Sequence, residues 1–248
     1  MGKSLRRAYL TDLVAGVREL DSETSRYINS VLRLQRDDEI EFFDGCGRSS
    51  QGRIIELNKR SVHVELAPPE LCPPQAPEVN LYCAIPKGDR VEWLLEKCSE
   101  LGASSITWVI YERSQDHRKD YTKRYDRWHK IACEAARQSH NTWIPKLIGP
   151  KPFESIVEAT QSTRTRVVLD TMSETIPLAK LRFQTNHPIE LMIGPEGGFS
   201  DAERNRLKEH KWIPTSLGET VLRIETAAMA GIVGIRTHGS LLDEDKGI

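Results

Sequence analysis

Residues 193–200 of this chain read Ile-Gly-Pro-Glu-Gly-Gly-Phe-Ser, and a mostly apolar run that begins at Ile189 leads into them. The run indicates a strand that breaks into a glycine-rich loop. Ser200 precedes Glu203 by three residues, which is the spacing of a capping box at the start of a helix. The loop is therefore predicted to join a strand to a helix. Loops of this kind lie at the carboxyl edge of a sheet, where open α/β proteins bind their ligands.

The order of the glycines in this loop matches neither a Walker A sequence nor the dinucleotide-binding fingerprint, and no lysine follows to reach a phosphate. Taken alone, a tight turn explains the glycines equally well, because glycine tolerates positive φ at little cost. A second glycine loop follows after one predicted helix and one short strand. This loop, Leu217–Ala227, reads LGETVLRIETA and has its own arginine and glutamates. The two loops together carry more information than either does alone.

The 248 residues allow one large domain or two modest ones. From Glu39 to Leu66 apolar and polar residues alternate with period two, and Gly and Asn interrupt the pattern, which predicts a β-meander in a small barrel. Residues 67–77 contain five prolines in eleven positions and indicate an extended linker. We therefore predict one domain at 1–72 and a second at 73–248.

Strand and helix patterns alternate after the linker. A capping box at Asp89 and Glu92 is predicted to open a helix that Gly102 ends. Strands are expected at 79–85, 106–110, 167–170 and 189–193, and further helices at 122–140, 153–159 and 225–237. This alternation predicts an α/β fold with a mostly parallel sheet that is covered on both faces.

The composition is that of an ordinary soluble protein, with 38% hydrophobic and 29% charged residues. No apolar run approaches the roughly 18 residues that span a bilayer, and no signal peptide is evident, so a cytoplasmic location is expected. The five cysteines are widely spaced, and neither a disulfide framework nor a metal site is predicted. Cys83, Cys98 and Cys133 lie in apolar-periodic segments and are interpreted as small buried hydrophobic residues.

A net charge of -1 argues against a protein that simply coats nucleic acid. The charge is nevertheless uneven, since residues 1–36 and residues 112–130 each hold seven Lys or Arg against four Asp or Glu. These segments are either two modest basic patches that follow a phosphate backbone or ordinary faces of mixed charge.

The two glycine loops together resemble the signature of the RsmE family, methyltransferases of the SPOUT superfamily that act on a uridine of small-subunit ribosomal RNA. Shorter matches run through nearly the whole chain in the family's order: Val31–Leu34, Phe43–Gly45, Lys87–Asp89, Lys97–Gly102, Glu112–Ser114 and Glu134–Ser139. The order and spacing of these matches make the resemblance specific.

The resemblance implies a fold that pattern alone does not predict. Residues 73–248 would form a SPOUT methyltransferase domain with a deep trefoil knot, built from loops at 169–173, 194–199 and 217–227, and residues 1–72 would form a PUA-like RNA-binding barrel. S-adenosyl-L-methionine would bind inside the knot. The implied cofactor-binding residues are Leu169, Thr171, Ile193, Gly194, Pro195, Gly197, Gly198, Leu217, Gly218, Val221, Leu222, Thr226 and Ala227.

The implied reaction is methyl transfer to N3 of a uridine in 16S ribosomal RNA. Arg223 would stabilise the negative charge on the uracil oxygens, and the alternative is a structural ion pair with Glu225 or Glu196. Glu196 is the nearest candidate base for the N3 proton, and the alternative is that it only braces its loop.

Partners follow from the same resemblance. Contact with ribosomal RNA or the small subunit would fall to Arg6, Arg7 and Arg33 near the amino end and to Lys87, Arg113, Gln138 and Asn141 facing the site. Trp143 and Phe199 are candidates to stack on the extruded base, with core packing as the alternative for Trp143. A homodimer is expected because family members build each site between two subunits, and the small-residue stripe Ala228, Gly231 and Ile232 allows close helix packing.

Three positions depart from the family pattern, namely Tyr27, Asn141 and Thr220, where a histidine, an arginine and a second basic residue are usual. Each lost cation removes a possible phosphate contact, so a non-catalytic RNA-binding assembly factor with the same fold is the first alternative. The second is an α/β enzyme that binds a nucleotide phosphate at the Gly194 loop. The missing lysine and the nearby Glu196 carboxylate argue against this second alternative.

Overall fold

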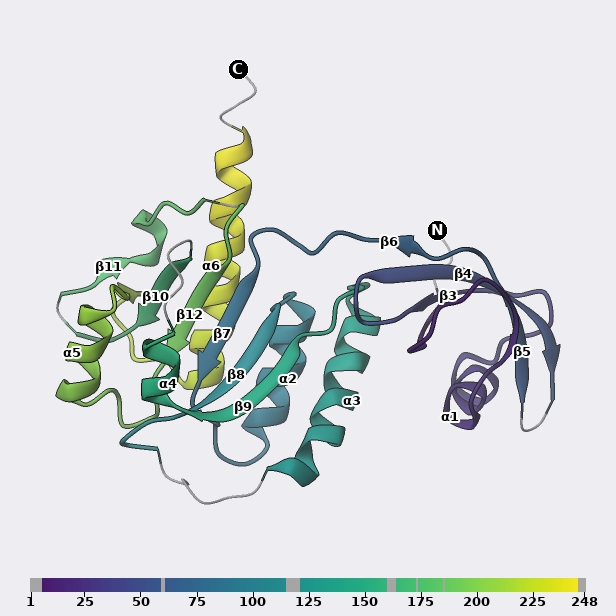
Figure 1. Cartoon of the computed structure of the whole chain (residues 1–248), viewed down its shortest axis with the longest axis horizontal. Coiled ribbons are helices and arrows are strands. Elements are labelled where there is room, and N and C mark those ends of the chain that lie inside the picture. Colours follow the sequence, from purple (N-terminus) through teal and green to yellow (C-terminus); the bar gives the residue numbers. More distant parts are fainter. Residues whose placement is uncertain are drawn as a thin grey trace. The chain divides into compact units, whose positions relative to one another are not determined.

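The computed structural model describes residues 6–58, 61–114, 121–159, 164–172, 174–184 and 186–244, with side chains as far as residue 237. It divides into two compact units (Figure 1). The first contains Met1–Pro74 with Ala136–Ile144, and the second contains Gln75–Ala135 with Pro145–Ile248. The segment Ala136–Ile144 thus belongs to the first unit, although it lies far beyond residue 72 in the sequence.

The first unit is built on a six-stranded sheet with the order β1-β3-β4-β5-β2, in which β6 also pairs with β4. Its strands are β1 (Arg7–Tyr9), β2 (Gly16–Glu19), β3 (Glu39–Phe43), β4 (Arg48–Leu57), β5 (Val62–Leu66) and β6 (Glu70–Leu71). The meander predicted from Glu39 to Leu66 is confirmed as the antiparallel strands β3, β4 and β5, whose alternate residues point into the core. The sequence reading missed β1 and β2, and also α1 (Ser22–Arg26), which continues into the π-helix η1 (Tyr27–Leu32).

The second unit contains a seven-stranded sheet with the order β11-β13-β10-β12-β7-β8-β9, and every pairing in it is parallel. Its strands are β7 (Val79–Cys83), β8 (Ser105–Ile110), β9 (Lys146–Pro152), β10 (Thr165–Leu169), β11 (Ile176–Pro177), β12 (Ile189–Ile193) and β13 (Ile213–Ser216). All five residues of the central strand β12 are buried, as expected for a sheet covered on both sides. The predicted parallel α/β architecture is confirmed.

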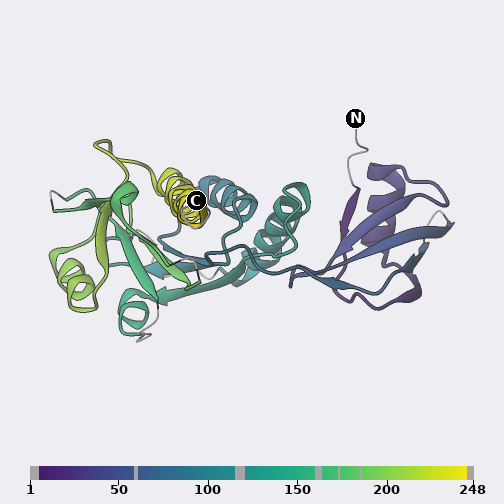
Figure 2. The same ribbon diagram turned by 90° about the horizontal axis from the view of Figure 1, so that it is seen from above.

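Helices cover both faces of this sheet (Figure 2). They are α2 (Arg90–Glu100), α3 (Thr122–Gln138), α4 (Phe153–Val157), α5 (Asp201–Glu209) and α6 (Ile224–Glu244), together with the 3₁₀ turn η2 (Leu178–Lys180). In both views α2 and α6 lie on one face, and α4 and α5 lie on the other.

The two predicted capping boxes have different outcomes. At the start of α5 the Ser200 hydroxyl accepts a hydrogen bond from the Glu203 amide at 3.3 Å, and the Glu203 carboxylate accepts one from the Ser200 amide at 2.8 Å, which confirms the prediction. At the start of α2 the prediction is wrong. Asp89 has helical dihedral angles and makes no side-chain capping bond, and only its carbonyl accepts from the amides of Glu92 and Trp93.

The small-residue stripe of α6 packs inside the chain. Ala228 and Ile232 are fully buried, and a Cβ atom on Gly231 would lie 2.7 Å from Leu191 of β12. The interpretation of this stripe as a surface for a second subunit is therefore wrong, because the glycine allows α6 to approach its own sheet.

A buried carboxylate joins three neighbouring strands. Glu190 on β12 is 4% exposed and forms ion pairs with Arg164 at 2.8 Å and Arg166 at 2.9 Å, both from the β10 side. The hydroxyl of Tyr82 on β7 donates to the same carboxylate at 3.2 Å. Burial raises the pKa of Tyr82 to about 12, with the neighbouring negative charge as the next cause, so this phenol remains a hydrogen-bond donor at neutral pH.

The cysteines should differ in reactivity toward iodoacetamide at pH 8. All five thiols are free, and Cys46 is exposed. Cys83 and Cys98 are fully buried as predicted, whereas the prediction is wrong for Cys133, which is half-buried. Burial raises the pKa of both buried thiols, so little reactive thiolate forms. Mass spectrometry of the native protein is expected to find Cys46 modified and Cys83 and Cys98 unmodified, whereas all five react in urea. Equal rates at Cys46 and Cys83 would contradict this packing.

Candidate functional site

A cavity of about 560 Å³ lies at the carboxyl edge of the parallel sheet. It is lined by the segments that follow β10, β12 and β13, which are neighbours in the order β13-β10-β12. We call it the loop cavity. Among the residues predicted to bind a cofactor, those that line it are Leu169, Thr171, Ile193, Gly194, Pro195, Gly197, Gly198, Leu217, Gly218, Val221, Leu222 and Ala227. Thr226 lies on the first turn of α6 and does not line it.

The walls of the loop cavity combine apolar side chains with accessible main chain. Leu169, Leu217 and Leu222 are half-buried and pack against the core of the second unit. Gly218 has a φ of +138°, and a Cβ atom built on it would meet nothing within 4 Å. The loop therefore needs glycine for its conformation, and its main chain faces open space.

Aromatic side chains of the core pack against the loop after β12 and hold it in place. Phe199 is 1% exposed and meets Tyr111 edge-on, and a Cβ atom on Gly194 would lie 2.9 Å from the Phe199 ring. The Tyr111 hydroxyl donates to the carbonyl of Ile193 at 3.0 Å. Phe199 thus belongs to the core, and its interpretation as a stacking platform for a base is wrong.

Glu196 is held by two cations. One oxygen lies 2.9 Å from Arg90 Nη2, and the other lies 3.5 Å from Lys87 Nζ. Arg90 also approaches Glu225 at 3.9 Å, and the second oxygen of that buried carboxylate has no hydrogen-bond partner among the described residues. Arg90 thus connects α2, the Glu196 loop and the start of α6. The sequence reading stopped at Lys87–Asp89 and missed this arginine, although it is the next residue.

Arg223 is exposed and lines the loop cavity just before α6. Within the part of the chain that the structure describes it forms no ion pair, since Glu196 and Glu225 pair with Arg90 instead. The alternative role of Arg223 as a structural partner of these carboxylates is therefore not supported. Its guanidinium group is available to a ligand.

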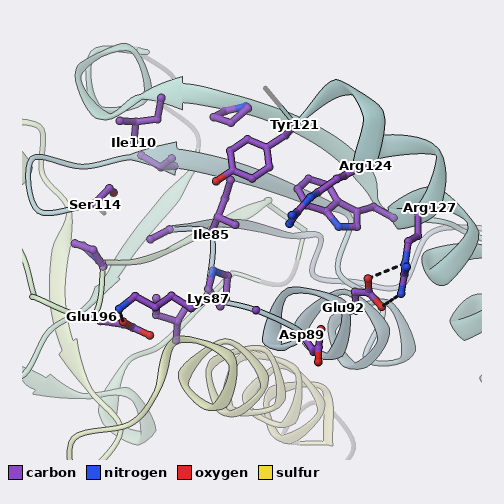
Figure 3. Close-up of a pocket in the computed structure, with 18 of the residues that line it drawn as sticks. Ile85, Lys87, Asp89, Glu92, Ile110, Ser114, Tyr121, Arg124, Arg127 and Glu196 are labelled. Carbon is purple, nitrogen blue, oxygen red and sulfur yellow. Dashed lines mark hydrogen bonds and ion pairs between the residues drawn. The ribbon is translucent and has the colours of Figure 1, made fainter. Parts of the chain in front are cut away.

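A second cavity of about 670 Å³ adjoins the first and shares Pro195, Glu196 and Ile224 with it. We call it the basic cavity because five of its lining residues are Lys or Arg. Lys87 (Figure 3) and Arg113, both predicted to contact RNA, are among them. Arg113 donates to the carbonyls of Gly197 at 3.0 Å and Phe199 at 3.4 Å, which ties it to the loop between the two cavities.

Arg7 does not have the surface position expected of an RNA contact. Its side chain is 2% exposed, forms an ion pair with Glu41 at 3.0 Å and lies over the Phe43 ring at 4.5 Å. It also donates to the carbonyl of Asn141 at 3.2 Å. Arg7 therefore stabilises the first unit by holding the segment Ala136–Ile144, and its prediction as an RNA-binding residue is wrong.

The other predicted RNA contacts of the first unit lie nearer its surface. Arg33 and Gln138 are exposed, Asn141 is half-buried, and Arg6 forms a partly exposed ion pair with Asp38 at 2.9 Å. The basic stretches 1–36 and 112–130 are described only in part, because residues 1–5 and 115–120 lie outside the described residues.

Trp143 and Tyr27 both make contacts inside the first unit. The Trp143 indole donates to the Cys72 carbonyl at 3.0 Å and lies against Gly47, where a Cβ atom would be 2.3 Å from the ring. This close packing supports the core alternative for Trp143. Arg137 lies over the Tyr27 ring at 5.0 Å.

The part of the chain that the structure describes contains neither a metal-binding cluster nor a membrane-spanning helix. No group of three His, Cys, Asp or Glu side chains there is arranged to hold a metal ion. Likewise, none of its helices has the length and apolar character needed to cross a membrane.

Comparisons with known proteins find similar proteins for both units of the chain. Residues 73–235 match the family described as RNA methyltransferase domain, and residues 20–67 match the family described as RNA methyltransferase PUA domain. Ribosomal RNA small subunit methyltransferase E of Synechocystis sp. is 31% identical over 84% of this chain and 69% of its own length. The protein of the same name in Bacillus subtilis is 28% identical over 92% of both chains.

Solved structures agree with the sequence relatives. The ribosomal RNA small subunit methyltransferase E of Neisseria gonorrhoeae, described as bound to S-adenosyl methionine, has a TM-score of 0.84 and 29% identity and covers 94% of this chain and 97% of its own. A structure from Legionella pneumophila, described as a complex with the bound cofactor SAM, has the same TM-score and identity, with coverages of 95% and 98%. The resemblance predicted from the glycine loops is confirmed, and the chain belongs to the ribosomal RNA small subunit methyltransferase E family.

Proposed function

We propose that this chain transfers a methyl group from S-adenosyl-L-methionine to N3 of a uridine in 16S ribosomal RNA. The observation that carries the proposal is the loop cavity, where three segments far apart in the sequence meet at the ends of adjacent parallel strands. The relatives of this chain are named as small-subunit ribosomal RNA methyltransferases, and the structure from Neisseria gonorrhoeae is described with the cofactor bound.

The residues of the loop cavity fit such a cofactor. Its volume of about 560 Å³ lies in the range of roughly 300–1,000 Å³ that is usual for small-molecule sites. Leu169, Leu217 and Leu222 offer apolar surface to a planar base, and the main chain beside Gly218 is open to hydrogen bonding. Glu196 adds a carboxylate to the lining, which suits a positively charged ligand. When bound, S-adenosyl-L-methionine supplies a methyl group activated by its sulfonium.

The side chains around the loop cavity have separate roles in the proposed reaction. Loss of the N3 proton leaves negative charge on the uracil oxygens, which the exposed guanidinium of Arg223 stabilises. Glu196 is the candidate base, and a base of this kind contributes roughly 10² to 10⁴ in rate. Its ion pairs with Arg90 and Lys87 also brace the loop. Glu196 therefore holds the wall between the two cavities in place whether or not it acts as the base.

The finer architecture belongs to the same proposal. The three loops, which line one cavity, would form a deep trefoil knot. One of the knot residues, Ser173, lies outside the described residues. Residues 1–72 would act as the PUA-like RNA-binding module, with Arg6 and Arg33 among its contacts, and residues 73–248 as the SPOUT catalytic domain. The chain is also proposed to form a homodimer. Its proposed location is the cytoplasm, because the substrate is ribosomal.

Replacing Gly218 by valine is expected to weaken binding of S-adenosyl-L-methionine by roughly 10- to 100-fold. A β-branched residue at φ +138° costs about 1–3 kcal/mol, and each 1.4 kcal/mol is tenfold in affinity. Isothermal titration calorimetry measures the change. Gly16 has a φ of +111° in equally open space in the first unit, so Gly16→Val is the matched control and should leave the affinity unchanged. An unaltered affinity in Gly218→Val would place the cofactor elsewhere.

The reaction itself is tested by incubating the purified protein and labelled S-adenosyl-L-methionine with small ribosomal subunits lacking the modification and, separately, with free 16S RNA. Digestion and mass spectrometry should identify 3-methyluridine in at least one of the two substrates. Binding of the cofactor without transfer to either substrate would favour a non-catalytic assembly factor.

A further inference from the structure

The basic cavity lies beside the loop cavity but is a separate space. It is formed by the segment after β7, the start of α2, the end of β8 and the start of α3 (Figure 3). The residues Pro195, Glu196 and Ile224 line both cavities, so a molecule seated in one meets the same wall as a molecule in the other. Of the residues that line this space, the proposed reaction uses only Glu196 and its ion-pair partner Lys87.

The floor of the basic cavity is aromatic. The Tyr121 ring lies at the cavity (Figure 3) and is stacked on Trp128, with ring centroids 5.8 Å apart and an angle of 28°. Trp128 is 1% exposed and supports Tyr121 from within the core. Ile85 and Ile110 add apolar surface to the same cavity. Tyr121 is 8% exposed, so part of its ring faces the cavity, and aromatic surface of this kind suits a planar heterocycle.

The rim of the basic cavity carries excess positive charge. The lining cations are Lys87, Arg113, Lys123, Arg124 and Arg127, and the lining carboxylates are Asp89, Glu92 and Glu196. This excess of two positive charges stands out in a chain whose net charge is -1. A concave surface of this sign attracts an anionic ligand.

Among the described residues, the contacts within this set leave Lys123 and Arg124 without an ion pair, and of these two Arg124 also contacts the aromatic floor. Arg127 is paired with Glu92 at 2.7 Å, Lys87 is paired with Glu196, and Arg113 is engaged with loop carbonyls. Arg124 forms no ion pair in the described part of the chain, and its guanidinium lies 5.9 Å from the centre of the Tyr121 ring. An arginine that lies over an aromatic floor can bind the phosphate of a nucleotide whose base contacts the same floor.

We infer that the basic cavity is the acceptor-nucleotide site, in which the uracil base lies against the part of the aromatic floor that faces the cavity and Arg124 binds the phosphate of the same nucleotide. This inference rests on the proposed function, because the shared wall at Glu196 then sets the base next to the methyl donor. A nucleotide within structured RNA must leave its stack to enter such a cavity, and a phosphate contact secures it once it has done so.

The test compares two probes that differ only in phosphate, uridine 5′-monophosphate and uridine. Their binding to the full chain is measured by equilibrium dialysis with S-adenosylhomocysteine present. The wild type is expected to bind the monophosphate roughly tenfold more tightly than uridine, since a hydrogen bond to a charged group contributes an effect of this size. Arg124→Ala should remove the difference and leave uridine affinity unchanged. Lys208→Ala removes one exposed cation from α5, on the opposite face of the sheet from α2, and should preserve the difference.

Three outcomes would overturn the inference: an unchanged preference for the monophosphate in Arg124→Ala, no binding of the monophosphate at millimolar concentration, or equal competition by inorganic phosphate. Circular dichroism and cofactor binding of Arg124→Ala establish that the variant is folded. The result of this binding experiment can be distinguished from the result of the methylation test of the proposed function. Transfer to ribosomal RNA by the wild type with no effect of Arg124→Ala on probe binding would reject only this site. A phosphate preference without any transfer would reject the reaction and keep the site.

Discussion

Replacing Arg223 by alanine is expected to lower kcat about 100- to 1,000-fold, the usual cost of removing one group that stabilises developing negative charge. The side chain is exposed at the loop cavity, and the neighbouring carboxylates of Glu196 and Glu225 pair with Arg90. Its loss should therefore disturb little of the resting structure. The affinity for S-adenosyl-L-methionine is expected to stay unchanged, and single-turnover methylation of small subunits measures the rate.

Two variants control the Arg223 experiment. Arg223→Lys keeps the charge but loses the planar fork, so it should recover part of the rate. Lys208→Ala removes an exposed cation from α5 and should behave as the wild type. Arg223 does not stabilise the transition state if Arg223→Ala methylates at the wild-type rate. The same conclusion follows if its affinity for S-adenosyl-L-methionine falls by the same factor as kcat.

Replacing Glu190 by alanine is expected to lower the free energy of unfolding of the second unit by about 3–5 kcal/mol, the usual cost of breaking a buried ion pair by removing one partner. Glu190 lies in the fully buried strand β12 and joins Arg164, Arg166 and Tyr82. Without the carboxylate, the mostly buried guanidinium of Arg166 loses its charged partner. Urea denaturation followed by tryptophan fluorescence measures the change.

The matched control for Glu190 is an exposed carboxylate in the same unit. Glu209 on α5 pairs with Arg206 at 2.8 Å but is largely exposed, so Glu209→Ala should leave the urea midpoint almost unchanged. Glu190→Gln keeps the shape and part of the hydrogen bonding and should fall between the wild type and Glu190→Ala. Equal midpoints for Glu190→Ala and Glu209→Ala would show that the buried network does not stabilise the sheet.

Local sequence signals predicted those parts of the fold that depend on neighbours in the chain. The helix start at Ser200 and Glu203, the strand Ile189–Ile193 and the meander of the first unit follow from spacing within a few residues, and the structure contains them all. The strand β9 was missed because Gly149, Pro150 and Pro152 interrupt its apolar pattern. Asp89 was misread because spacing alone does not fix the backbone angles that a capping side chain needs.

The sequence pattern did not predict which segments far apart in the chain lie together in the fold. The order β13-β10-β12 brings three loops into one cavity, and nothing within a single loop indicates which strands are neighbours. The residues of those loops were found only through the family resemblance. Arg7 shows the converse error, because a charged residue near the chain end is usually exposed, whereas here Glu41 and the Phe43 ring compensate its burial.

Mass spectrometry of the nucleosides in 16S ribosomal RNA from a strain that lacks this gene tests the proposed reaction directly. The 3-methyluridine made by this enzyme is expected to disappear and to return when the wild-type gene, but not the Arg223→Ala gene, is restored. An unchanged amount of 3-methyluridine in the deletion strain would contradict the proposed reaction.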